Sequence, residues 1–162
     1  MKGSAIAIAI AVTALQTGHR SDAALPGTAA NGVQGATPMK IQIKVKDAVL
    51  RATLLDSEAA RDFASLLPLS LPMNDLFRRE KYGGLPRAIS EGGKRTHTYE
   101  VGDIAYWRPG PDVAIYYRND GQRIPEPGIV VLGRIESGVE ALDRPGSMNV
   151  TIELLRDAQG RR

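Results

Sequence analysis

Strict alternation of apolar and polar residues in two distant segments restricts the fold of this chain most. The alternating apolar residues are Met39, Ile41, Ile43 and Val45 in the first segment, and Met148, Val150, Ile152 and Leu154 in the second. Successive side chains of a strand point to opposite faces, so each segment predicts a strand with one buried face. Pairing these segments would remove an exposed edge from each. We therefore expect the first and last strands to pair and close a barrel.

The stretch between these segments predicts more strands and one main helix. Ser57 is a good N-cap, and apolar residues follow at helical spacing to Leu67, where Pro68 ends the helix. Strands are expected at 49–55, 69–73, 99–107, 112–118 and 129–135, with an irregular stretch up to residue 98 and a short helical turn near 138–142. This order predicts an all-β fold, a closed β-barrel of about eight strands with one main helix and one short helix.

The N-terminal segment is typical of a secretory signal. Lys2 precedes an uncharged, largely apolar run over 5–15, and small residues stand near 21–23, so a signal peptide is predicted over 1–23. The run is shorter than the about 20 residues that span a bilayer. An edge strand is the alternative, although it would leave an apolar edge at a free terminus. We expect a periplasmic or secreted protein with no stable membrane anchor after processing.

Composition predicts the boundaries of the linker, the barrel domain and the C-terminal tail. Residues 24–38 carry no charge and are rich in Ala, Gly, Thr and Pro, which predicts a flexible linker. The barrel domain should therefore cover 39–156, with a disordered tail at 157–162.

Charge and residue content argue against several classes of function. The chain has 21 basic and 18 acidic residues without a long basic stripe, so no nucleic-acid partner is expected. It contains no cysteine, which excludes a disulfide framework and a thiol nucleophile. His97 stands alone after the predicted signal peptide, without the spacing of a ligand set. We expect neither a metal site nor a cofactor.

Three segments resemble cyclophilins, in the same order along the chain. Residues 52–66 (ATLLDSEAARDFASL) resemble a strand, acidic turn and first helix, and 102–107 (GDIAYW) with 113–117 (VAIYY) resemble the central hairpin. Residues 131–142 (VLGRIESGVEAL) are similar to the late Val-Phe-Gly-Lys-Val-x-x-Gly-Met-x-x-Val segment. Glu80-Lys81-Tyr82 with Leu85-Pro86 looks still more like an uncharacterised bacterial cyclophilin-like family. The resemblance covers about 39–155 and implies the cyclophilin-like barrel.

The chain departs from the cyclophilin pattern at the residues of the isomerase site. Isomerases of the family carry Phe-His-Arg followed by Gln-Gly-Gly-Asp, whereas this chain has Phe77-Arg78-Arg79 and no Gln-Gly-Gly-Asp, and Ile115 replaces the hairpin Gln. In the family, the Arg donates hydrogen bonds that help a twisted prolyl amide lose its resonance. The resemblance therefore implies Arg79 as a candidate catalytic residue, with Arg118 as a second candidate.

Aromatic residues on the two predicted hairpin strands mark a candidate binding surface. Tyr106 and Trp107 are adjacent, as are Tyr116 and Tyr117, so each strand should place one ring in the core and one outside. We expect Trp107 and Tyr117 to form a wall for an extended peptide or a flat ligand, while Tyr106 is either a ligand contact or a core residue.

Arginines near such a wall could supply donors for an anion or an amide. The candidates are Arg79, Arg87 and Arg118, each of which could equally be an ordinary surface arginine. Glu80, Glu100 and Asp103 are too scattered in sequence to predict paired acid–base carboxylates, and Asp103 is expected to cap backbone amides.

Three interpretations of function follow. The first is an exported cyclophilin-like domain without established activity that binds a peptide segment or small ligand in a surface groove. The alternative is a divergent peptidyl-prolyl cis-trans isomerase. A third is a structural partner domain, because the resemblance implies a redox flavoprotein as a partner class.

Overall fold

The computed structural model describes residues 38–155. The predicted signal peptide (1–23), the predicted linker except its last residue, and the predicted tail (157–162) lie outside the described residues. Within 38–155, no helix has the length and apolar character needed to cross a membrane. The helical elements are α1 (Glu58–Ala64) and the 3₁₀ turn η1 (Val139–Leu142). The strands are β1 (Lys40–Val45), β2 (Ala48–Leu54), β3 (Leu69–Leu76), β4 (Glu80–Gly84), β5 (Arg95–Thr96), β6 (Asp103–Trp107), β7 (Asp112–Tyr116), β8 (Ile129–Ser137) and β9 (Met148–Leu154).

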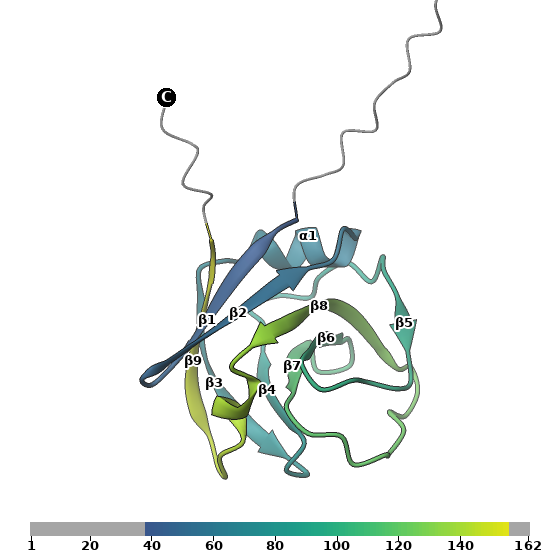
Figure 1. The fold of residues 1–162 in the computed structure, drawn as a ribbon. Coiled ribbons are helices and arrows are strands. Elements are labelled where there is room, and N and C mark those ends of the chain that lie inside the picture. Colours follow the sequence, from purple (N-terminus) through teal and green to yellow (C-terminus); the bar gives the residue numbers. More distant parts are fainter. Residues whose placement is uncertain (1–37, 156–162) are drawn as a thin grey trace, which may run out of the picture. The chain divides into compact units, whose positions relative to one another are not determined.

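Eight antiparallel strands form a closed barrel, which confirms the predicted fold (Figure 1). Their order is β2-β1-β9-β3-β4-β7-β6-β8, and the pairing of β8 with β2 completes the ring, while the short β5 adds to β8. The expected pairing of the first and last strands is present, with Ile43 of β1 opposite Ile152 of β9. The ends of the described chain are also joined, since the amide of Leu155 donates to the carbonyl of Lys40 over 2.8 Å.

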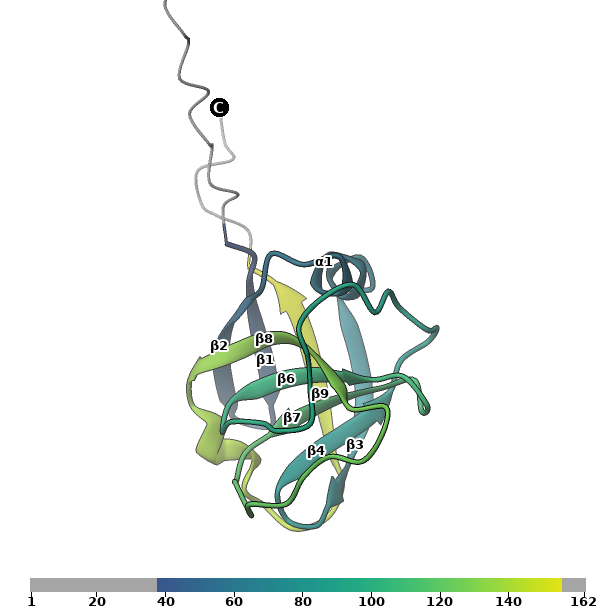
Figure 2. The ribbon, with the colours of Figure 1, turned by 90° about the vertical axis from the view of Figure 1, so that its right-hand side faces the viewer.

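Helix α1 covers one end of the barrel (Figures 1 and 2). It begins as predicted, because the hydroxyl of Ser57 accepts a hydrogen bond from the amide of Ala60 over 3.2 Å. Phe63 and its alanine neighbours are fully or almost fully buried and belong to the cluster that fills the barrel.

The helix is shorter than the sequence predicts. It ends at Ala64, and the amides of Leu66 and Leu67 donate to carbonyls three residues back rather than four. The chain tightens here because the ring of Pro68 disfavours the α conformation at Leu67.

Strand β4 lies in the stretch for which the sequence predicts irregular structure. Its inward-facing residue is Lys81, which is fully buried, so the strand lacks the apolar alternation that marks its neighbours. The ammonium is satisfied inside the barrel by Asp75 at 2.5 Å, by the carbonyl of Gly146 at 2.9 Å and by the carbonyl of Arg144. A satisfied buried lysine therefore replaces an apolar core residue in β4.

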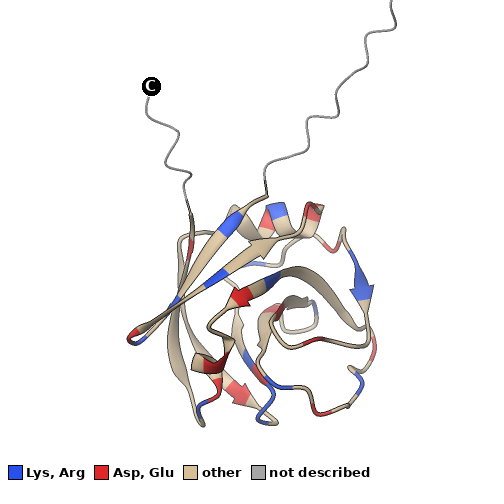
Figure 3. Ribbon diagram, in the orientation of Figure 1, with Lys and Arg blue, Asp and Glu red and all other residues tan. Residues whose placement is uncertain are grey.

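Basic and acidic positions are interspersed along the ribbon (Figure 3). Several of them pair on the outer surface, such as Lys44 of β1 with Glu153 of the neighbouring β9 at 2.8 Å, and Lys40 of β1 with Glu136 of β8 across the intervening β2. Exposed pairs of this kind contribute little to stability, so the barrel depends on its apolar interior.

Candidate functional site

The outer face of β4, β7 and β6 carries an apolar cluster separate from the barrel interior. Alternation turns Lys81 and Ile115 inward and leaves Glu80 and Tyr116 on the other face, where they lie directly opposite each other in the β4–β7 register. The cluster on this outer face consists of Tyr99, Ala105, Ala114, Tyr116, Ile124 and Ile129, with Tyr82 and Trp107 packed against it.

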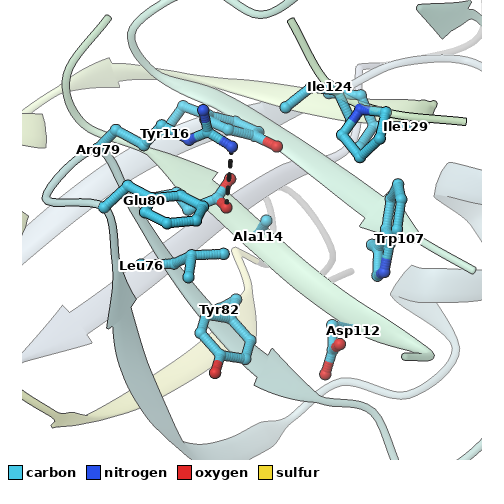
Figure 4. A pocket seen from close by; sticks show the side chains of 12 residues that line it. Leu76, Arg79, Glu80, Tyr82, Trp107, Asp112, Ala114, Tyr116, Ile124 and Ile129 are labelled. Atoms are coloured by element: carbon cyan, nitrogen blue, oxygen red, sulfur yellow. Dashed lines mark ion pairs between the residues drawn. The ribbon is translucent and has the colours of Figure 1, made fainter. Parts of the chain in front are cut away.

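This face is hollowed, and we call the cavity the outer-face hollow (Figure 4). Its volume is about 300 Å³. The lining residues are Leu76, Phe77, Arg79, Glu80, Tyr82, Trp107, Asp112, Ala114, Tyr116, Ile124, Pro125 and Ile129. His97 holds the loop that supplies Ile124 and Pro125. Its backbone carbonyl accepts a hydrogen bond from the Ile124 amide over 2.9 Å, and its Nδ1 lies 3.0 Å from the Ile124 carbonyl oxygen. The hollow thus has strand walls on one side and a fastened loop on another.

A buried ion pair lies in the wall of the hollow. Arg79 and Glu80 are only 6% and 5% exposed, and Nη2 of the arginine lies 3.7 Å from Oε1 of the glutamate (dashed line, Figure 4). Nη1 of Arg79 also donates to Asp120 over 3.4 Å. The guanidinium carbon lies 5.1 Å from the ring centre of Phe77 and 5.4 Å from that of Tyr99, within the range of cation–π attraction.

Two polar atoms of this pair have no hydrogen-bond partner. Nε of Arg79 and Oε2 of Glu80 are the buried side-chain atoms left unpaired among residues 38–155. Burial raises the pKa of the Glu80 carboxyl, although Tyr116 and Arg79 oppose that shift. Burial also works against the charge of Arg79, but Glu80, Tyr99, Asp120 and Tyr116 together outweigh it and keep the pKa of the guanidinium above its ordinary value. The pair therefore has one unpaired donor, Nε of Arg79, and one unpaired acceptor, Oε2 of Glu80, both buried in the wall of the hollow.

The tyrosines behind this pair are fixed by stacking and hydrogen bonding. The rings of Tyr99 and Tyr116 stack with centres 4.2 Å apart and planes 20° apart. The hydroxyl of Tyr99 donates to Asp120, and this bond is the main reason that the pKa of Asp120 lies below its ordinary value. Burial raises the pKa of Tyr116 far above its ordinary value, so its hydroxyl stays protonated. These contacts hold the wall beside Arg79 in one arrangement.

The structure brings two of the predicted site residues together in the hollow, Arg79 and Trp107. Tyr106 instead points into the barrel, where it is almost fully buried and its hydroxyl lies 3.4 Å from the amide of Ile89. Of the two locations that the sequence left open for Tyr106, the structure shows the core.

Tyr117 also lies in the core rather than beside Trp107. The register places Trp107 opposite Asp112, so the residues that share its face are Asp112, Ala114 and Tyr116. Tyr117 falls on the inward side, where its hydroxyl donates to Asp75 over 2.7 Å. Tyr116 therefore occupies the place on the outer face that the sequence assigned to Tyr117.

The other two arginines lie away from the hollow. Arg87 pairs with Asp62 of α1 at 2.5 Å and donates to the hydroxyl of Ser65 at 3.0 Å. Arg118 pairs with Asp143 at 2.5 Å. Neither side chain lines the hollow, and each already has a carboxylate partner.

The main residues that sequence reasoning missed are Glu80 and Tyr82. They share a face of β4, and recognising that strand would have placed both beside Arg79. Asp103 has the predicted role, because its carboxylate accepts from the Glu100 amide at 2.9 Å; it also accepts from Arg134. Residues 38–155 contain no group of three or more His, Cys, Asp or Glu side chains placed to hold a metal ion.

Comparison with known proteins agrees with the fold. No curated protein matches the chain. The chain is similar to the solution structure of the hypothetical protein AF2241 from Archaeoglobus fulgidus, with a TM-score of 0.60 and 25% identity over 75% of this chain and 99% of that one. A model of the cyclophilin-like family matches residues 43–153, the greater part of the sequence. The chain therefore belongs to the cyclophilin-like family.

Proposed function

We propose that this protein is a binding domain that holds a peptide segment or small ligand in the outer-face hollow. The observation that carries the proposal is the composition of the lining, where the rings of Trp107 and Tyr82 and the buried polar pair of Arg79 and Glu80 line the same hollow. Ligand sites are concave, mostly apolar, and contain a few polar groups that orient the ligand. A hollow of about 300 Å³ accommodates a short peptide segment or a small molecule.

The binding test uses Trp107, because it is the single tryptophan of the chain. Its indole N–H gives one cross-peak in a ¹H–¹⁵N spectrum, which can be followed during titration with acetyl-Phe-Ala-Phe-amide. This probe has aromatic side chains for the wall and no charged ends. Saturable shifts of Trp107, Tyr82 and Ala114 are expected, with a large loss of affinity in Trp107→Ala and no change in Val49→Ala, an exposed position on β2.

Two results would contradict the binding proposal. One is the absence of any saturable shift with this probe and with a panel of capped tripeptides and small carboxamides. The other is saturation at the second hollow of the barrel surface, which is lined by residues such as Lys94, Thr96 and Arg134, with Trp107 unmoved.

The proposed site of action is outside the cytoplasm, periplasmic or secreted. Support comes from the charge and apolar run of residues 1–23. N-terminal sequencing of protein recovered from the culture medium or the periplasm should begin near Ala24, whereas a cytosolic pool that keeps Met1 would contradict export.

A divergent peptidyl-prolyl isomerase is the second candidate. The observation that favours it is that Arg79, which matches the catalytic arginine of the resemblance, is the one candidate arginine that lines the hollow. A protease-coupled prolyl-peptide assay tests whether the protein has isomerase activity. Acceleration that is lost in Arg79→Ala but kept in Arg87→Ala would support the isomerase, and an uncatalysed rate at high protein concentration would exclude it.

A further inference from the structure

We infer that the outer-face hollow binds its ligand through an amide that carries an N–H, rather than through a prolyl amide or a charged group. The inference rests on the proposed binding function and names the chemical class of its ligand. It is carried by Nε of Arg79 and Oε2 of Glu80, the buried side-chain polar atoms without a partner in the described part of the chain.

The two unpaired atoms each lack the hydrogen bond that a buried polar atom normally makes. Buried polar groups in folded proteins are almost always hydrogen-bonded, and an unpaired one is destabilising. Both atoms belong to adjacent residues in the wall of one hollow, on the face that also carries Trp107. A ligand that pairs both atoms at once would gain affinity from each of them.

The chemistry of the two atoms selects the group that can do this. The Nε–H of Arg79 can only donate, and an ionised Glu80 carboxylate can only accept. A peptide residue in an extended conformation presents its own N–H and C=O on the same side, and a primary amide presents both within one group. Either offers a C=O to the first atom and an N–H to the second. A prolyl amide has no N–H, so it would leave Oε2 of Glu80 unpaired.

Charge disfavours the alternatives to a neutral amide. Glu80 and Asp120 contact the Arg79 guanidinium, and Asp112 also lines the hollow, so three carboxylates lie in or beside the hollow with one guanidinium. An anionic ligand would be repelled by these carboxylates. An ammonium group would face the positive Arg79 and would still leave its Nε without an acceptor. A neutral ligand with donor and acceptor side by side meets neither difficulty.

Phe77 lies beside the pair and is largely exposed to solvent. Its ring lies over the Arg79 guanidinium at 5.1 Å, yet 73% of the residue is exposed. Phe77 and Arg78 form the turn of the β3–β4 hairpin with φ of 53° and 56°, a left-handed conformation that is uncommon for such side chains. A ligand that displaces this largely exposed ring would reach the guanidinium.

An N-methyl scan of one probe tests the inference directly. Acetyl-Phe-Ala-Phe-amide is compared with three derivatives, each methylated at one backbone nitrogen, and with acetyl-Phe-Pro-Phe-amide, all titrated against the Trp107 indole signal. Methylation at one nitrogen should weaken binding by roughly tenfold to a hundredfold, as expected for loss of a hydrogen bond to a buried charged group. The other methylations should have smaller effects.

Variants connect that penalty to Glu80. In Glu80→Met, which keeps the side-chain volume and removes the acceptor, the methylation penalty should fall to less than about threefold. In the control Arg118→Ala, outside the hollow, the full penalty should remain. Because the scan of the unmodified protein needs no variant, misfolding of Glu80→Met would leave the test intact.

The possible results separate this inference from the proposed function. Equal affinities for all five probes, with dependence on Trp107, would overturn the amide inference and leave the binding function standing. Tightest binding of the prolyl probe would also overturn the inference and favour the isomerase. Failure of every probe to bind would overturn both.

Discussion

The ammonium of Lys81 lies 2.5 Å from Oδ2 of Asp75, and the lysine is fully buried on the inward side of β4. The same carboxylate oxygen accepts from the hydroxyl of Tyr117 at 2.7 Å, and the lysine also binds the carbonyls of Arg144 and Gly146. This network joins the β3–β4 hairpin, the end of β7 and the loop before β9, so it fixes the strand whose other face lines the hollow.

Replacing Lys81 should be strongly destabilising. Lys81→Met leaves the Asp75 carboxylate without its cation and frees two backbone carbonyls, so the free energy of unfolding should fall by about 3–5 kcal/mol. Urea denaturation measures the difference. The matched control is Lys44→Met, which breaks an exposed pair with Glu153 and should cost less than about 1 kcal/mol. Equal effects of the two substitutions would show that the buried network has no special role.

The same network predicts a loss of stability in acid. Burial alone would raise the pKa of Asp75, but hydrogen bonds from Lys81 and Tyr117, with the charge of Lys81 and a hydrogen bond from the Arg78 amide, outweigh it and hold the pKa below its ordinary value of 3.8. A lowered folded-state pKa stabilises the protein above that ordinary value, and the contribution disappears as the pH falls through the lowered pKa. The stability difference between the native protein and Asp75→Asn should therefore be constant near neutral pH and shrink below pH 3.8. A difference that grows in acid would contradict this assignment.

Glu80 should show the opposite dependence on pH. Burial raises the pKa of its carboxyl above the ordinary 4.5, so the folded protein holds an extra proton between 4.5 and the raised value. Stability of the native protein relative to Glu80→Gln should fall as the pH rises through this range. Unfolding in urea at a series of pH values measures the relative stability. A relative stability that rises over the same range would show that Arg79 stabilises the charged carboxylate more than burial destabilises it.

Gly133 should contribute to stability at the closure of the barrel. A Cβ at this position would lie 2.5 Å from the carbonyl oxygen of Thr53 and 2.9 Å from Cα of Leu54, where β8 pairs with β2. Gly133→Ala should therefore destabilise the protein by roughly 1–3 kcal/mol in thermal or urea unfolding. Gly84→Ala is the control, since its nearest neighbour would be the Asp112 side chain at an ordinary 3.8 Å. Equal stability of the two variants would contradict the close approach.

Local pattern was sufficient for most of the barrel. Alternation at the two ends of the domain predicted β1 and β9 and their pairing, and Ser57 marked the start of α1. Strand β4 was not predicted, because its buried residue is a lysine whose hydrogen-bond partners include residues far away in the sequence. A charge satisfied by tertiary contacts leaves no periodic signal.

The candidate site depended more on register than on residue type. Sequence reasoning identified Arg79 and Trp107, which do line the hollow. It expected Tyr117 as the second wall residue, but the pairing of Trp107 with Asp112 turns Tyr116 to that face. A shift of one residue reverses the faces of a strand, and only the folded sheet fixes this choice.

The most direct test of the binding account is an experimental structure of the protein with acetyl-Phe-Ala-Phe-amide. We expect the probe in the outer-face hollow with a ring against Trp107, a backbone C=O bonded to Nε of Arg79 and a backbone N–H bonded to Oε2 of Glu80. A probe bound elsewhere on the barrel, or bound in the hollow with both of these atoms still unpaired, would contradict it.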